Sequence, residues 1–103
     1  QKQKNYKVAL LFFWLQSIEL AKERVRTRVL EGGHNIEENV IERRYFRGIK
    51  NLFEICLNLV DATLIFDNSF GKHHLIAKTN DLKEFEVTDV EKFKKLKEIY
   101  DTQ

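Results

Sequence analysis

The hydrophobic pattern near the start of the chain predicts a buried strand followed by a helix. Residues 8–15 are continuously apolar, whereas a strand with one wet face would alternate apolar and polar side chains. Such a run is typical of a parallel strand covered on both faces in an α/β protein. Ser17 then offers a helix N-cap with Glu19 in the first turn. Apolar residues at helical spacing extend this helix to Leu30, where a glycine pair ends it.

A second helical pattern follows the glycine pair. Asn35 is placed to cap this helix, with Glu38 at the capping-box position. An apolar stripe then continues to about Leu59. The remaining expected elements are a strand within 61–67, a turn at 68–72, weaker strands at 74–78 and 84–87, and a last helix that is capped by Thr88 or Asp89 and ends near Tyr100.

The order of these elements predicts a single α/β domain over residues 1–103. Two buried strands joined by a long helical segment form a crossover, and a crossover joins parallel strands. This crossover is unusual because it contains two helices with a glycine turn between them. The expected segments are a strand at 8–15, a unit of two helices at 17–60, a strand with its turn at 61–69, and short strands with a C-terminal helix at 73–103.

Composition and charge narrow the class of protein only a little. The chain has 103 residues, of which 43% are hydrophobic and 33% charged, as in ordinary globular domains. A net charge of +2 is too small to predict a nucleic-acid or membrane partner. The single cysteine excludes an internal disulfide and a multi-cysteine zinc site. We therefore expect a cytoplasmic protein, with no signal peptide or membrane span, that binds neither nucleic acid nor membranes.

The arginines are concentrated in one segment. All six lie between positions 24 and 47, and the lysines lie outside it. A guanidinium group presents a rigid fork of donors that matches phosphate oxygens, which an ammonium group does not. Arg24 and Arg28 share a helix face, and Arg43 and Arg47 repeat that four-residue spacing. If the two helices fold against each other, their arginines converge on one polyphosphate.

The same segment is compatible with an ordinary solvated surface. Glutamates are interspersed with the arginines, and Glu23 lies three residues before Arg26, where a surface ion pair can form. On the second helix, Glu38 and Glu42 form a like-charge pair at four-residue spacing. Charge patterning alone favours the solvated surface over the phosphate clamp.

Three further polar residues are candidates for phosphate or ligand contacts. His34 follows the glycine pair and either donates to a phosphate or is simply exposed. Asn68 and Ser69 follow a predicted strand, and ligands bind beyond the carboxyl ends of strands in open α/β sheets. A plain Asx turn at 67–69 is the alternative. His73 and His74 would point to opposite faces of a strand, so we predict no metal site there.

The chain contains no complete set of catalytic motifs. It has no phosphate-binding glycine loop, no dinucleotide fingerprint, no nucleophile elbow and no zinc-protease motif. Phosphoryl transfer needs a phosphate cradle, a lysine, a magnesium site and a positioned base, and this sequence supplies only candidate cations. We therefore do not expect the chain to be an active enzyme by itself.

Four ordered motifs in the arginine segment and after it carry a family resemblance. They are RVRTRVLEGGHNI at 24–36, IERRY at 41–45, NLF at 51–53 and DNS at 67–69. Together they resemble the carboxy-terminal half of the zeta-toxin-like P-loop kinases, also described as predicted ABC-type ATPases, over roughly residues 5–69. The resemblance implies a partial P-loop kinase-like domain with a parallel sheet, a helical lid within 17–60, and an N-terminal P-loop half that is absent here.

The resemblance also implies roles for particular residues. Arginines in such a lid stabilise charge on the transferring phosphoryl group. ATP and Mg²⁺ are implied as cofactors of the complete protein, and a nucleotide, an antitoxin and the missing N-terminal half as its partners. The implied catalytic residues are Arg28, Arg43 and Arg44, and the implied nucleotide or phosphate contacts are Arg24, His34, Asn68 and Ser69.

A second function from a different class stays open at this point. Without the catalytic half, strand edges and apolar faces of the domain are expected to be uncovered. The chain is then a degenerate, non-catalytic module that acts by binding a protein partner or by self-association.

Overall fold

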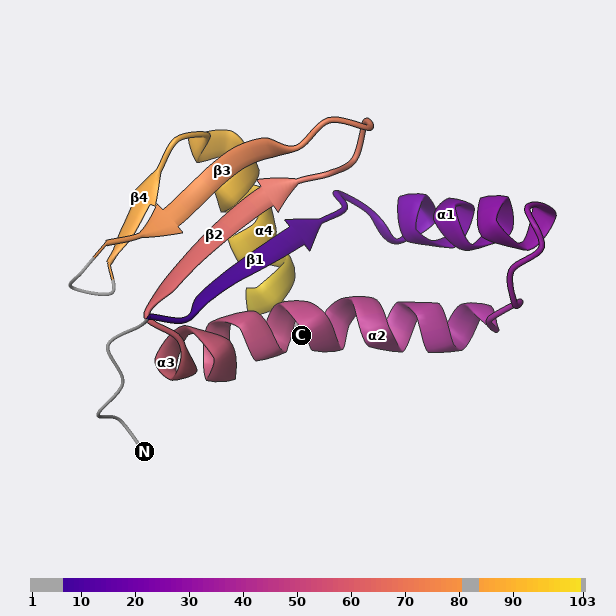
Figure 1. Ribbon diagram of the computed structural model, residues 1–103, viewed down its shortest axis with the longest axis horizontal. Coiled ribbons are helices and arrows are strands. Elements are labelled where there is room, and N and C mark those ends of the chain that lie inside the picture. Colours follow the sequence, from indigo (N-terminus) through magenta and orange to yellow (C-terminus); the bar gives the residue numbers. More distant parts are fainter. Residues whose placement is uncertain (1–6, 81–83, 103) are drawn as a thin grey trace.

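The computed structural model describes residues 7–80 and 84–102, except for the side chains of Cys56 and Leu57. It is an α/β protein with a four-stranded mixed sheet in the order β1-β2-β3-β4 (Figure 1). β1 (Ala9–Trp14) pairs in parallel with β2 (Ala62–Asp67). β3 (His74–Thr79) and β4 (Phe85–Val87) extend the sheet in antiparallel fashion. The predicted α/β class and the parallel crossover are confirmed.

Both predicted crossover helices form, and a tight turn separates them. The first helix is capped by Ser17, whose Oγ accepts a hydrogen bond from the backbone N–H of Leu20 at 3.2 Å. Gly32 has a φ of 99°, which residues with a side chain seldom adopt. A Cβ atom at Gly33 would lie 2.8 Å from the carbonyl oxygen of Arg28, so the second glycine is required as well. The helical elements are α1 (Ile18–Leu30), α2 (Glu38–Asn51), the π-helical segment η1 (Leu52–Cys56), α3 (Leu57–Leu59) and α4 (Val90–Asp101).

The start of α2 differs from the prediction. The helix begins at Glu38 after Glu37, which makes no side-chain capping bond, so the predicted capping box of Asn35 and Glu38 is wrong. The extended backbone at Glu37 carries half-buried Ile36 into the space between α1 and α2. This packing prevails over the local capping signal, as tertiary contacts often do.

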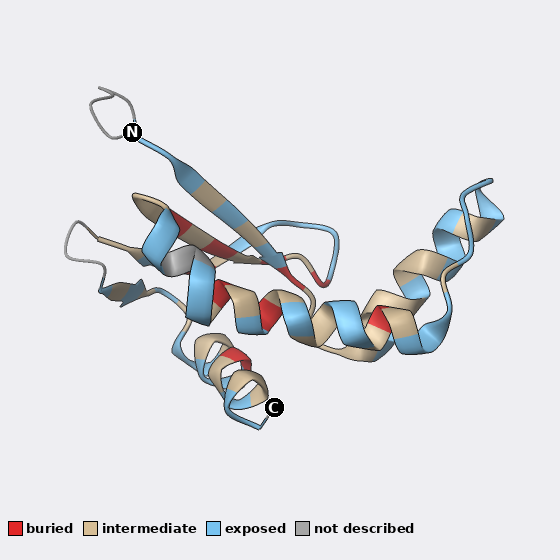
Figure 2. Cartoon of the chain, turned by 90° about the horizontal axis from the view of Figure 1, so that it is seen from below, coloured by how far each residue is buried: buried red, intermediate tan, exposed pale blue. Residues whose placement is uncertain are grey.

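The helices that pack on the sheet cover only one of its faces (Figure 2). In β1, Trp14 is 1% exposed, whereas Leu11 is 52% and Phe13 is 45% exposed. The prediction that both faces of this strand are covered is therefore wrong. In the described part of the chain β1 is an edge strand, and its alternately exposed residues lie on the face of the sheet opposite α2 and α4.

The core lies between the covered face of the sheet and the helices α2 and α4. Leu96 of α4 and Ile76 of β3 are fully buried there. Within residues 7–80 and 84–102, no helix is long and apolar enough to cross a membrane. The buried core cluster consists of Trp14, Ile49, Leu52, Ile65, Ile76, Ala77 and Leu96.

Candidate functional site

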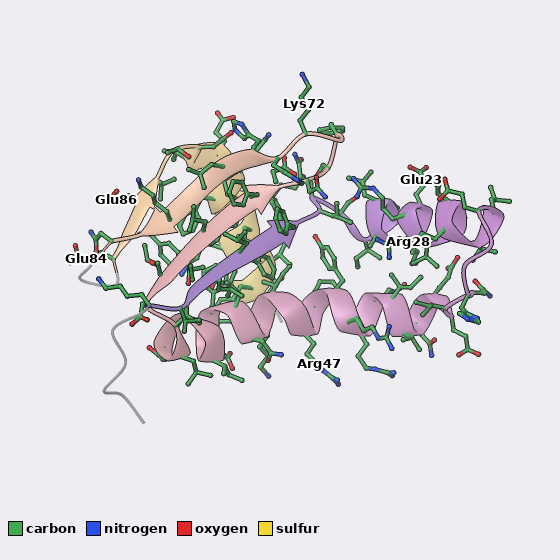
Figure 3. The ribbon with its side chains drawn as sticks, in the orientation of Figure 1. Glu23, Arg28, Arg47, Lys72, Glu84 and Glu86 are labelled. Carbon is green, nitrogen blue, oxygen red and sulfur yellow. The ribbon has the colours of Figure 1, made fainter. Side chains whose placement is uncertain are left out.

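A cavity of about 400 Å³ lies between α1 and α2, beyond the carboxyl ends of β1 and β2. Arg24 and Arg28 of α1, Arg44 of α2 and Asn68 after β2 give this cavity its polar lining. Figure 3 shows Arg28 pointing from α1 towards α2. We call this cavity the arginine pocket. Its remaining lining is Phe13, Leu15, Ala21, Val25, Ile36, Ile41 and Tyr45.

Arg24 ties the first helix to the turn after β2. Its Nη2 donates to the carbonyl oxygen of Asn68 at 2.5 Å and lies 3.5 Å from that of Ser69. A guanidinium group has five N–H donors, so this bond leaves others for a ligand in the pocket. Arg24 therefore holds α1 in place and adds positive charge to the pocket wall.

Tyr45 ties the second helix to the end of β1. Its hydroxyl donates to the carbonyl oxygen of Leu15 at 2.6 Å. Burial raises the pKa of Tyr45 above its ordinary value, so the phenol keeps its proton at neutral pH. Sequence reasoning assigned no role to the hydroxyl of Tyr45, because nothing local indicates that it meets a backbone group thirty residues away.

The turn after β2 is built around a buried carboxylate. Asp67 is 2% exposed, and its Oδ1 accepts from the hydroxyl and backbone N–H of Ser69 at 2.5 and 3.0 Å. Its Oδ2 accepts from Gln16 Nε2 at 2.7 Å and from Lys92 Nζ at 3.0 Å. Burial alone would raise the pKa of Asp67, but these hydrogen bonds outweigh it and hold the pKa below its ordinary value.

Ser69 belongs to this buried turn. It is 6% exposed, and its hydroxyl also accepts from the backbone N–H of Gln16 at 2.9 Å. The hydroxyl of Ser69 thus donates one hydrogen bond to Asp67 and accepts one from Gln16. Asn68, by contrast, is half-buried and lines the arginine pocket. The Asx turn considered for 67–69 is present, and it presents only Asn68 to the pocket.

The structure brings together some of the predicted site residues and not others. Arg24, Arg28, Arg44 and Asn68 share the arginine pocket. Three further candidates are not among the residues that line it, namely Arg43, His34 and Ser69, and Ser69 is buried in the turn. Arg28 and Arg44 line the pocket although they are exposed, as Arg43 and His34 are. Figure 3 shows Arg47 on α2 pointing away from α1. The roles predicted for Arg43 and His34 stay predictions.

An ion-pair cluster connects α1 with α2. Lys22 Nζ lies 2.7 Å from Glu42 Oε2 and 3.5 Å from Glu38 Oε1. Arg26 Nη2 lies 3.6 Å from the other carboxylate oxygen of Glu38. We call these four residues the helix latch. Sequence reasoning missed it because its pairs span the glycine turn, where no fixed spacing indicates a contact.

The arginine pocket fits an anion and does not fit a divalent cation. Three guanidinium groups and an amide supply its polar lining, and none of its lining residues is acidic. Magnesium prefers carboxylate and other oxygen ligands. Within the described ranges, no three His, Cys, Asp or Glu side chains are grouped so that they could hold a metal ion. We therefore assign no magnesium-binding role to the residues that line the arginine pocket.

Comparison with known proteins adds no family to this description. No protein-family model, curated protein or solved structure matches the chain. The function has to be inferred from the arginine pocket and from the elements that hold it.

Proposed function

We propose that the chain binds the terminal phosphates of ATP in the arginine pocket, as the lid-bearing C-terminal portion of a zeta-toxin-like kinase. The observation that supports this function best is the convergence of Arg24, Arg28 and Arg44 from two helices on one cavity. That cavity lies beyond the carboxyl ends of two parallel strands, where α/β sheets bind ligands.

Phosphate is the ligand group that this lining suits. Guanidinium groups bind phosphate oxygens through short, charge-assisted hydrogen bonds, often two at a time. Apolar side chains make up the rest of the pocket wall. Arg24 is half-buried beside this wall, whereas Arg28 and Arg44 line the pocket while exposed to solvent. The apolar wall and the convergence of three arginines on one cavity support the phosphate clamp.

The chain's own residues are proposed to bind and orient the phosphates. In this proposal α1, the glycine turn and the first part of α2 form the lid over the nucleotide. Guanidinium groups keep their protons at all relevant pH values, so Arg28 and Arg44 stabilise negative charge on the phosphoryl group and transfer no proton. The phosphate loop, the magnesium site and the base belong to the complete kinase, and the chain is not active without them.

A ligand series tests the proposed function. We expect tripolyphosphate and ATP to bind to the chain in isothermal titration calorimetry at low ionic strength, and adenosine to show no binding. Added salt should weaken both interactions because the pocket is open to solvent and its charges are screened. Adenosine that binds as tightly as ATP, or the absence of tripolyphosphate binding up to millimolar concentration, would refute the phosphate clamp.

The Glu42→Gln variant distinguishes two effects on anion binding: the positioning of the arginines by the helix latch and the simple change in charge. The change removes a negative charge from α2, so electrostatics alone predicts tighter binding of an anion. It also removes the ionic attraction from the 2.7 Å contact between Lys22 and Glu42 in the helix latch. We expect weaker tripolyphosphate binding by calorimetry, because a loosened lid no longer holds Arg28 and Arg44 together.

Glu23→Gln is the matched control for this change. Glu23 is exposed on α1, where Figure 3 shows it pointing away from α2. Its substitution removes the same charge without touching the latch, and binding should stay the same or tighten slightly. If Glu42→Gln tightens binding as much as the control does, the latch has no positioning role.

A further inference from the structure

The turn after β2 holds Arg24 at the wall of the arginine pocket. The guanidinium Nη2 of Arg24 meets two backbone carbonyl oxygens of this turn, that of Asn68 at 2.5 Å and that of Ser69 at 3.5 Å. Arg24 is half-buried, whereas Arg28 and Arg44 line the same pocket while exposed. The position of the Arg24 guanidinium therefore depends on where these two carbonyl oxygens lie.

The hydroxyl of Ser69 joins this turn to the residue that leads into α1. Its Oγ donates to Oδ1 of Asp67 at 2.5 Å and accepts from the backbone N–H of Gln16 at 2.9 Å. The backbone N–H of Ser69 also donates to Oδ1 of Asp67, at 3.0 Å. Gln16 directly precedes Ser17, the N-cap of α1. The hydroxyl therefore connects the turn after β2 to the start of the helix that carries Arg24.

These contacts form a closed ring around one end of the arginine pocket. From Gln16 the chain runs about two helical turns along α1 to Arg24. The guanidinium of Arg24 then meets the carbonyl oxygens of the turn, and the hydroxyl of Ser69 closes the ring at Gln16. Ser69 thus helps to fix both the start of the helix and the acceptors that the arginine meets.

We infer that Ser69 is a positioning residue of the phosphate site, an inference that rests on the proposed function. Ser69 is 6% exposed and is not among the residues that line the pocket, so its effect on a phosphate is indirect. It acts through Arg24, because its hydroxyl holds the turn whose carbonyl oxygens keep the guanidinium at the pocket wall. A donor that is held in place before the anion arrives needs no reordering on binding, and this increases affinity.

Ser69→Ala tests this inference in isothermal titration calorimetry with tripolyphosphate. The change leaves the backbone N–H of Gln16 without its acceptor and loosens the ring. We expect binding to weaken about three- to tenfold, which corresponds to the loss of one ordinary hydrogen bond.

Thr79→Ala is the matched control for this change. The hydroxyl of Thr79 accepts from the backbone N–H of Thr63 at the same distance, 2.9 Å. Thr63 lies near the opposite end of β2 from Asp67, away from the pocket. Removal of this hydroxyl should destabilise the fold comparably and leave tripolyphosphate affinity within about twofold, because distant sites act independently. Urea denaturation shows whether both variants are folded under the conditions of the titration.

A double-mutant cycle with Arg24→Ala determines whether Ser69 acts through Arg24. In a chain that already carries Arg24→Ala, we expect Ser69→Ala to change tripolyphosphate affinity by less than about twofold, because the group that it positions is absent. Equal losses from Ser69→Ala in both backgrounds would show that Ser69 affects the fold in general, and would overturn the inference.

The NMR signal of the Arg24 Nε–Hε group gives a readout that needs no ligand. Ser69→Ala should shift this signal and leave those of Arg28 and Arg44 nearly unchanged, while Thr79→Ala should shift none of the three. An Arg24 signal that does not respond to Ser69→Ala overturns the inference. Tripolyphosphate that binds equally well to the unmodified chain and to Ser69→Ala does so too, but leaves the phosphate clamp standing. No binding to the unmodified chain refutes the phosphate clamp and this inference with it.

Discussion

We expect a chain with Arg28→Ala and Arg44→Ala to show no measurable binding of tripolyphosphate or ATP, and each single change to weaken binding about 10- to 100-fold. A hydrogen bond to a charged group contributes about 1.5–3 kcal/mol, which corresponds to that range for one arginine. Both guanidinium groups line the arginine pocket from opposite helices, so losing both removes the charge from two of its walls. Isothermal titration calorimetry on the folded variants measures the effect.

Arg47→Ala is the matched control for these arginine changes. Arg47 is exposed on α2, and its side chain points away from the pocket. Its removal lowers the net charge by the same amount as either single change, and we expect binding to stay within about twofold because exposed distant charges are screened. Equal losses for Arg28→Ala, Arg44→Ala and Arg47→Ala would mean that the phosphates respond to net charge and have no defined site.

Asp67→Ala should reduce the free energy of unfolding by about 2–4 kcal/mol, because it removes a buried carboxylate that accepts from several donors at once. Gln16, Ser69 and Lys92 would all lose their shared partner. Lys92 lies on α4, so the same change also detaches that helix from the end of β2. Small domains are stable by only about 5–15 kcal/mol, which makes this a large fraction. Urea denaturation followed by circular dichroism measures it.

Glu23→Ala is the control for this stability prediction, because Glu23 is an exposed acidic residue on α1. Its substitution should change the free energy of unfolding by less than about 0.5 kcal/mol. A loss from Asp67→Ala no larger than that of the control would show that the buried carboxylate contributes nothing to the fold.

The lowered pKa of Asp67 also gives stability a definite pH dependence. A carboxyl group with a lower pKa in the folded state stabilises the fold fully above its unfolded pKa. This contribution disappears as the pH falls from the ordinary aspartate range through the lowered value. Asp67→Asn should therefore lose less stability than the unmodified chain between pH 7 and pH 3. Parallel acid dependence of the two proteins would contradict the lowered pKa.

Local patterns were sufficient for most of the secondary structure. The serine cap, the helical apolar spacing and the glycine turn defined α1 through interactions within a few residues. The exposed face of β1 was not predictable in the same way. Its unbroken apolar run indicates burial on both sides, but what covers a strand depends on elements distant in sequence.

The candidate site, too, was predictable from local patterns only in part. The helical spacing of the arginines singled out Arg24 with Arg28 and Arg43 with Arg47, and only the first pair lines the pocket. Arg44 entered through the family resemblance, because local charge patterning alone favoured a solvated surface.

The ion pairs of the helix latch join residues 12 to 20 positions apart. The hydrogen bonds from Tyr45 to Leu15 and from Gln16 to Asp67 span 30 and 51 positions. Such contacts are decided by how helices and strands pack, which a local pattern does not record.

NMR observation of the arginine Nε–Hε groups during a titration with tripolyphosphate tests the phosphate clamp most directly. We predict that the signals of Arg24, Arg28 and Arg44 shift together along one saturating curve, while that of Arg47 stays nearly unchanged. Saturation would give one affinity for the three pocket residues. Equal, non-saturating shifts of all six arginines would show diffuse attraction of an anion to a basic surface, and the arginine pocket would then not be a phosphate site.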